Sequence, residues 1–309
     1  MKKRNIFLVF TSVIHLLFPI IVVGQQVSSV PDAFKALKTE PEVFIIKNKM
    51  AVPTKSGHFQ GVQLIEQNGR KKLLISGSSL SKAYLLQVDL VSNRSEKIIV
   101  LMEEPFRHAG GIQVSDSFLA VGIEDNFAKT TSKVCLYDYH NKNLEKSIPT
   151  IKINRAGEEK RHTAGALGLL KLDNEFLAVV GNWDSRNWDF YWIDPEQDRQ
   201  ELFYSFEAPE DWGSYQSINL IKDQDSIYAI GFYQKKDIGL GYVDLILVSR
   251  IGRFEAIMEK INSKTFFCKN KVDFSSAAGL QVDKKGKLHI WSTQKYSNKK
   301  IAINRFSQP

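Results

Sequence analysis

Cysteine is scarce in this chain, which has only Cys135 and Cys268 among its 309 residues. Secreted domains that depend on disulfides are small and rich in cysteine, and this chain is neither. Cys135 falls inside an apolar stretch and Cys268 lies far along the chain, so we expect two separate, mostly buried thiols. The sequence therefore excludes a disulfide framework.

Helical periodicity is also lacking, except over residues 31–38, and no nucleic-acid motif is present. Lysines occur as scattered pairs at expected turns, such as Lys71-Lys72 and Lys284-Lys285. This distribution indicates a solvated surface rather than a basic stripe. We therefore expect no nucleic-acid partner.

The one long apolar run lies near the N-terminus. It covers residues 6–23, follows three basic residues, and ends in small residues that suit a cleavage after Gly24. This arrangement predicts a secretory signal peptide over residues 1–24, with an uncleaved membrane anchor as the alternative. Without the signal, 39 basic residues remain against 34 acidic ones. We expect a secreted or periplasmic protein with no membrane span after signal removal.

A short phrase recurs five times along the chain. Three strong copies open with histidine and two weaker copies open with serine, at His58, His108, His162, Ser214 and Ser276. The copies start 50, 54, 52 and 62 residues apart. Such spacing is typical of propeller blades and other repeat arrays.

Each repeat also contains β-rich runs divided by turn signals, and four runs per repeat are typical of a blade. The fifth repeat lacks a fourth run, whereas residues 43–47 form a run with no repeat of their own. Pairing these two parts of the chain closes the ring and removes both sheet edges. We therefore predict an all-β fold, a five-bladed β-propeller of four-stranded blades closed by an N-terminal strand in the last blade.

In this repeat pattern the chain resembles secreted five-bladed β-propellers. The resemblance implies a single closed domain over residues 43–309, preceded by an N-terminal linker over residues 25–42. It brings no catalytic signature with it, because the acidic triplets of propeller glycosidases and the acidic loops of calcium nucleotidases have no convincing match here.

Blade topology predicts which residues share a rim. If each phrase enters an innermost strand, the antiparallel second strand ends at the same rim. A second ring of side chains then joins the phrase-opening residues around one mouth of the central channel, and it comprises Ser79, Glu124, Asn182, Tyr233 and Gln294.

The three histidines allow two interpretations. The first is a divalent metal site. The number of protein ligands in a catalytic zinc site is three, which His58, His108 and His162 match, and Glu124 lies nearby. The other, which we favour, is that each histidine ties its blade to the next by hydrogen bonds. The amides of Gln63, Gln113 and Gln281, which recur in the phrase, predict further links that satisfy buried backbone groups between blades.

Two loops of the third and fourth repeats break the regular pattern. One carries Trp183 and Asp184, and the next carries Glu210, Asp211 and Trp212. Aromatic faces beside carboxylates suit sugar recognition. The same three carboxylates and Glu124 are also candidates for a general acid and base, although a glycosidase needs two of them at a defined separation. No Gly-x-Ser-x-Gly turn is present, so a serine hydrolase is not expected.

The sequence therefore predicts a monomeric propeller that binds a small polar ligand, with carbohydrate favoured, at the histidine-bearing rim. Two alternatives stay open, namely a metal- or carboxylate-dependent hydrolase of the glycosidase, phosphoester or lactone class, and a protein-interaction platform. The candidate ligand contacts are His58, His108, His162, Glu124, Asn182, Trp183, Asp184, Trp212, Tyr233 and Gln294.

Overall fold

The computed structural model describes residues 27–51, 57–67, 69–141, 143–224, 226–235, 239–249 and 256–309. Within these ranges the chain forms twenty strands and one short helix, so the all-β class is as the sequence predicts. The predicted signal peptide over residues 1–24 lies outside the described residues. No helix in the described part of the chain is long and apolar enough to cross a membrane.

Three antiparallel sheets each contain four strands that are consecutive in the chain. Val, Ile, Leu and aromatic residues fill these strands, and β9 alternates buried and exposed side chains, as a strand with one solvated face does. The strands are β6 (His108–Ser115), β7 (Phe118–Glu124), β8 (Thr131–Asp138) and β9 (Ile151–Ala156), then β10 (Ala166–Leu172), β11 (Glu175–Gly181), β12 (Asn187–Asp194) and β13 (Arg199–Glu207), then β14 (Ser217–Lys222), β15 (Ile227–Tyr233), β16 (Leu240–Ser249) and β17 (Ile257–Phe267).

The remaining eight strands form one closed sheet that joins the two ends of the described chain. Within it, β1 runs antiparallel to β20, with Glu42 opposite Arg305 and Lys47 opposite Lys300. The orphan N-terminal run therefore pairs with the last strand, as predicted. The strands are β1 (Glu42–Lys47), β2 (Phe59–Gln67), β3 (Arg70–Gly77), β4 (Lys82–Asp89), β5 (Arg94–Glu103), β18 (Ala278–Val282), β19 (Leu288–Thr293) and β20 (Lys300–Ser307).

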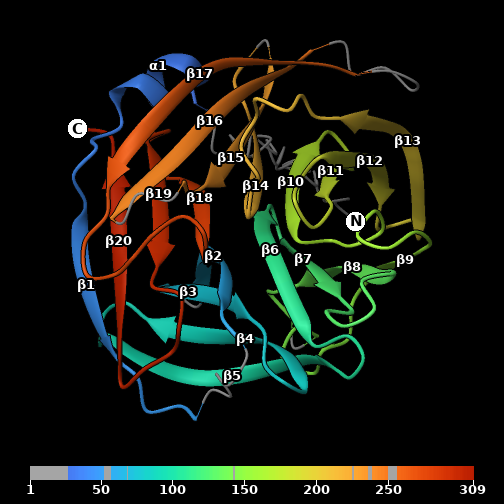
Figure 1. Ribbon diagram of the computed structural model, residues 1–309. Coiled ribbons are helices and arrows are strands. Elements are labelled where there is room, and N and C mark those ends of the chain that lie inside the picture. Colours follow the sequence, from blue (N-terminus) through green and yellow to red (C-terminus); the bar gives the residue numbers. More distant parts are fainter. Residues whose placement is uncertain are drawn as a thin grey trace, which may run out of the picture.

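Five inner strands surround the middle of the molecule, where Figure 1 labels β2, β6, β10, β14 and β18. Each of these strands contacts the next, and β18 contacts β2, so they form a closed ring. Close approach explains two glycines of the repeated phrase, because a Cβ on Gly61 or Gly111 would lie less than 3.0 Å from a backbone nitrogen of the neighbouring inner strand. Gly165, in contrast, has room for a Cβ.

Three buried amide side chains hold the inner strands together. Gln113 accepts hydrogen bonds from the backbone N–H groups of Leu169 and Leu220, at 2.8 and 2.7 Å. Gln63 donates to Asn219, which in turn accepts from the N–H of Leu280. The predicted role of Gln63 and Gln113 is thus confirmed.

The amide of Gln281, however, accepts from the indole of Trp291 within its own sheet. The position that completes the network is Asn219 of β14, which no other phrase matches with an asparagine.

Residues 27–41 of the predicted linker form an ordered strap across the sheet of β14–β17 and the strands β18–β20. Its helix α1 (Val30–Ala36) begins after Ser29, whose hydroxyl caps the first turn. Asp223 accepts from the first helical N–H, and Lys264 donates to carbonyls at the C-terminal end. The helix buries Phe34 in a core shared with β15, β16 and β19, and Figure 1 shows it beside β17.

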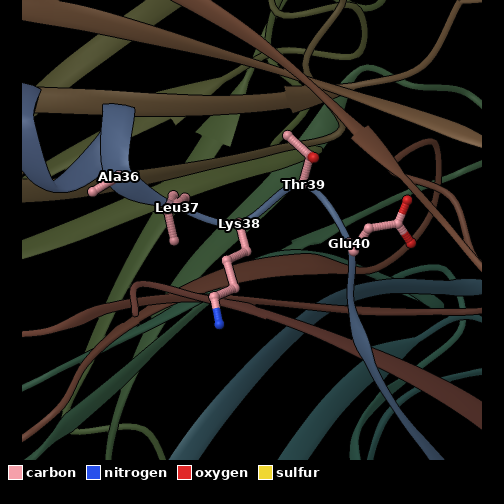
Figure 2. Close-up of a pocket in the computed structure, with 5 residues that line it drawn as sticks. All are labelled: Ala36, Leu37, Lys38, Thr39 and Glu40. Carbon is pink, nitrogen blue, oxygen red and sulfur yellow. The ribbon is translucent and has the colours of Figure 1, made fainter.

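A pocket of about 460 Å³ opens along the connector from α1 to β1, and its lining residues are Ala36, Leu37, Lys38, Thr39 and Glu40. Figure 2 shows these five side chains strung along one segment and pointing in different directions. None of them is a candidate site residue. This pocket therefore follows from the path of the strap and lies apart from the predicted site residues in the sequence.

Candidate functional site at the entry rim

The entry rim is the side of the ring on which the inner strands begin and the second strands end. Cross-strand pairing defines it, because His108 at the start of β6 lies opposite Glu124 at the end of β7. In the same way Ala166 lies opposite Gly181, and Ser217 opposite Phe232. The loops between second and third strands lie on this rim too.

A chain of polar side chains crosses the entry rim from β2 to β10. Gln60 Nε2 lies between two imidazoles, 2.5 Å from His58 Nε2 and 3.2 Å from His108 Nε2. His108 Nε2 is 3.5 Å from Glu124 Oε1, and Glu124 Oε2 accepts from the Ala164 N–H at 2.9 Å. We call these four side chains the polar chain, and it links three successive parts of the ring.

Burial sets the charge state of the polar chain. It lowers the pKa of His58 to about 4, with help from the charge of Lys295, and it lowers the pKa of His108 to about 3, with help from His58 and Arg107. Burial raises the pKa of Glu124 to about 7, against the opposing effects of the Ala164 hydrogen bond and the Arg155 charge. Both imidazoles are therefore neutral at pH 7, and the contact between His108 and Glu124 is not an ion pair.

His162 does not join this group. Its ring lies against Gly157, just past the end of the outermost strand β9, and its carbonyl accepts from Ser132. Among the described residues no three His, Cys, Asp or Glu side chains are arranged to hold a metal ion. The predicted three-histidine donor set therefore does not fit a zinc site with three protein ligands.

Three members of the predicted second ring serve the turns between strands. Ser79 accepts from the N–H of Lys82, Asn182 from that of Asn187, and Gln294 from that of Ala302. Gln294 also donates to two carbonyls of its own turn. These side chains fix the loops of the entry rim. Glu124 differs because its carboxyl group lies against the neighbouring inner strand rather than capping its own turn.

The aromatic candidates divide between the rim and the core. Trp183 is 40% exposed in the loop between β11 and β12, with the Lys129 ammonium 3.8 Å from its ring centroid. Trp212 is buried against Trp188, so its ring faces are covered by protein. Tyr233 packs on Tyr215, which donates a hydrogen bond to the buried Asp244.

The loop carboxylates of Asp184 and Asp211 have partners outside the polar chain. Asp184 accepts from the N–H of Arg186 within its own loop. Asp211 pairs with Lys260 of β17, an outermost strand, and Glu210 beside it is exposed. No hydrogen bond or ion pair joins Asp184, Glu210 or Asp211 to Glu124 in the described part of the chain, and the predicted pair of catalytic carboxylates stays a prediction.

Several buried polar atoms of the entry rim lack partners, and sequence reasoning named only some of the residues that carry them. Gln60 Oε1, His108 Nδ1, Ser217 Oγ and Ser276 Oγ are all buried and have no hydrogen-bond partner among the described residues. His108 and Ser276 open their phrases, so repetition located them. Gln60 and Ser217 lie inside their phrases, and the one counterpart of Gln60 is Gln216 in the fourth phrase, so repetition did not single them out.

A second missed feature lies between the sheets that begin with β6 and β10. Cross-strand pairing continues from Glu124 to Ser132 and then to Arg155, so these three residues and His108 form one polar row. Arg155 donates to Asp189 at 2.6 Å. Arg161 and Ser205 also donate to the Asp189 carboxylate, which ties the two sheets together.

No protein-family model matches the chain, and no curated protein matches its sequence. Similar solved structures include a β-xylosidase, with 9% identity over 87% of this chain and 95% of that one and a TM-score of 0.47. A GH43 β-1,3-galactosidase has 9% identity over 82% and 90%, with a TM-score of 0.46. The WD40 domain of Neurospora crassa Pan2 has 10% identity over 82% and 90%, with a TM-score of 0.40. These scores are below 0.5 and assign neither a family nor an activity.

Proposed function

We propose that the protein binds a carbohydrate, as a small polar ligand, at the entry rim. The observation that carries this proposal is the set of buried polar atoms without partners, namely Gln60 Oε1, His108 Nδ1, Ser217 Oγ and Ser276 Oγ. Leaving such atoms unpaired costs free energy, about 1–3 kcal/mol each. A ligand rich in hydroxyl groups would satisfy both the donors and the acceptors among them.

The neutral histidines of the polar chain support a hydroxyl-bearing ligand over a small inorganic anion at that chain. The pKa values of His58 and His108, about 4 and about 3, leave both imidazoles uncharged at pH 7. Neutral imidazole, amide and hydroxyl groups are the polar partners expected around a sugar ring. The exposed ring of Trp183 adds an apolar surface on the same rim.

A hydrolase is the second candidate, and one observation favours it. Burial raises the pKa of Glu124 to about 7, so its carboxyl group is largely protonated just below neutral pH, as a general acid must be. A glycosidase would need a second carboxyl group across the sugar. Binding without hydrolysis is our first proposal, because the unpartnered buried atoms call for a ligand and not for a second catalytic carboxyl group.

Architecture and location complete the proposal. We count β2–β5 as one blade and β18, β19, β20 and β1 as another, which with the three other sheets makes a five-bladed propeller over residues 43–309. The N-terminal apolar run supports export to the periplasm or the exterior, and we propose that the exported protein is a monomer without a nucleic-acid partner.

Binding to a glycan array, followed by calorimetric titration of the best saccharide, tests this function. Ser217→Ala and Ser276→Ala remove unpartnered buried hydroxyls, so they should weaken binding without lowering the melting temperature. His108→Ala removes the unpartnered Nδ1 atom and should also weaken binding. Its matched control is His140→Ala, in an exposed turn beyond β8 on the opposite rim. Absence of saccharide binding, or affinities unchanged by all three rim variants, would refute the proposal.

A further inference from the structure

Exposed apolar side chains lie on the loops of the entry rim. Leu80, Phe127, Trp183 and Tyr296 are 43%, 86%, 40% and 51% exposed. Each lies in the loop between the second and third strands of its group, after β3, β7, β11 and β19. Although they are far apart in the sequence, the topology brings these loops to one rim. We call the four residues the apolar crown.

Three lysines of the loops between second and third strands, after β7, β15 and β19, lie over aromatic rings. The Nζ atoms of Lys129, Lys235 and Lys295 are 3.8, 4.8 and 5.6 Å from the ring centroids of Trp183, Tyr242 and Tyr296. In the described part of the chain none of the three has a carboxylate partner, whereas Lys82 pairs with Glu103 and Lys260 with Asp211. The entry rim therefore carries the positive charge of three lysines that no described carboxylate pairs with.

Two of these lysines lie next to the polar chain. The carbonyl of Lys295 accepts from the N–H of Phe59, the residue after His58. The N–H of Lys129 donates to the carbonyl of Asp125, the residue after Glu124. The electrostatic influence of Lys295 reaches His58, and that of Lys129 reaches Glu124. A ligand seated on the polar chain is thus within the field of both ammonium groups.

We infer that the ligand is an acidic glycan, whose hydroxyls bind the polar chain while its carboxylate or sulfate groups pair with the rim lysines. This inference rests on the proposed carbohydrate binding and adds the charge of the ligand. An acidic sugar has an apolar ring face and an anionic group on the same unit, and an aromatic side chain with an ammonium over one of its faces offers a partner to each. Crown residues on several loops fit an oligosaccharide rather than one sugar.

The test compares acidic glycans with neutral versions of the same chains. The probes are polygalacturonate against its methyl ester, and dextran sulfate against dextran, titrated into the full chain at low and at high salt. We expect the acidic member to bind more tightly in at least one pair, with an advantage that shrinks as salt screens the charges. Substituting Lys129, Lys235 and Lys295 together by Gln should remove about tenfold in affinity for that member, as three surface ion pairs would.

Matched controls lie on the opposite rim. Lys284→Gln changes an exposed lysine in the turn between β18 and β19, and Val91→Ala changes a side chain that is 79% exposed in the turn after β4. Neither should change affinity, whereas Trp183→Ala and Tyr296→Ala should weaken it.

The outcomes separate this inference from the proposed function. If neutral members bind as tightly as acidic ones and the lysine substitutions have no effect, the inference fails and carbohydrate binding stands. If no saccharide binds, both fail. Tighter binding of a single-stranded oligonucleotide such as oligo(dT) than of any acidic glycan, lost in the same lysine variant, would overturn the inference in favour of a nucleic-acid ligand.

Discussion

His108 and Glu124 are direct cross-strand partners in β6 and β7, and their side chains meet at 3.5 Å with almost no exposure to solvent. Burial moves their pKa values in opposite directions, because it disfavours the charged form of each. At pH 7 the imidazole is therefore neutral, and the carboxyl group is about half protonated. The free energy of unfolding therefore depends on pH through both groups, and substitutions can separate the contribution of each.

Glu124→Gln should change how stability varies with pH. A carboxyl group whose pKa rises from its ordinary 4.5 to about 7 on folding stabilises fully below pH 4.5 and loses that contribution as pH rises to 7. Glutamine keeps an acceptor for the Ala164 N–H without ionising. Relative to the wild type, the variant should gain up to about 3 kcal/mol of unfolding free energy between pH 4.5 and pH 8. Urea denaturation at each pH measures this, with exposed Glu210→Gln as control, and parallel curves for Glu124→Gln and wild type would contradict it.

The two imidazoles of the polar chain should remain neutral in mildly acidic solution. Their pKa values, about 4 for His58 and about 3 for His108, lie below the ordinary histidine value of 6.5, so their contribution to stability is complete above pH 6.5 and is lost as pH falls through these values. NMR spectra of histidine-labelled protein, assigned with His58→Gln and His108→Gln, should show both rings uncharged at pH 5.5. A charged ring at that pH would mean that solvent reaches the polar chain.

The sequence repeats predicted more of the fold than of the candidate site. Inner and second strands follow from apolar runs at a steady spacing, and the pairing of residues 43–47 with the last strand follows from simple closure. The sequence could not show that Trp212 is buried, because a polar loop can carry its tryptophan inward. Nor could it reveal that Arg155 reaches Asp189, since no repeat contains a counterpart of that ion pair.

Asp189→Asn should be among the most destabilising single substitutions. Two guanidinium groups and the Ser205 hydroxyl donate to this carboxylate, and the Arg155 side chain is only 3% exposed. Without the carboxylate, a buried cation loses its partner, which costs about 3–5 kcal/mol. Ser205→Ala removes one neutral donor and should cost about 1 kcal/mol. Equal losses in urea denaturation would show that the ion pairs contribute little.

Low pH should reduce the stability that the contacts of Asp189 with Arg155, Arg161 and Ser205 contribute. Burial raises the pKa of Asp189, but the Arg161 hydrogen bonds and the Arg155 charge outweigh it and hold the pKa below its usual range. The stability contributed by Asp189 is therefore present above its unfolded-state pKa and is lost as pH falls through the lower, folded one. Asp189→Asn should lack this part of the acid dependence, which denaturation between pH 5 and pH 2 can detect.

Deleting residues 25–48 should destabilise the whole domain, because it removes α1 and reopens two sheet edges at once. Phe34→Ala isolates the contribution of the helix and should cost about 3–5 kcal/mol, since the ring is fully buried. Val91→Ala, at an exposed turn, should change stability by less than about 0.5 kcal/mol. A truncated protein that melts at the wild-type temperature would show that neither the strap nor β1 supports the ring.

The two cysteines are free, as predicted, and should react slowly in the native protein. Burial raises the pKa of Cys135 to about 11 and that of Cys268 to about 12, so very little thiolate exists at pH 7.5. Alkylation followed by mass spectrometry should label neither site quickly before unfolding and both after it. Rapid labelling of Cys135 would indicate that β8 opens to solvent.

The pairing of β1 with β20 joins Glu42 to Arg305, which are 263 positions apart. The ribosome makes Glu42 long before Arg305. Strand β1 must therefore wait, with an unpaired edge, until β20 has been made. Shorter nascent chains can form individual sheets but not the circle. The ring of inner strands likewise stays open until β18 has been made and can lie beside β2.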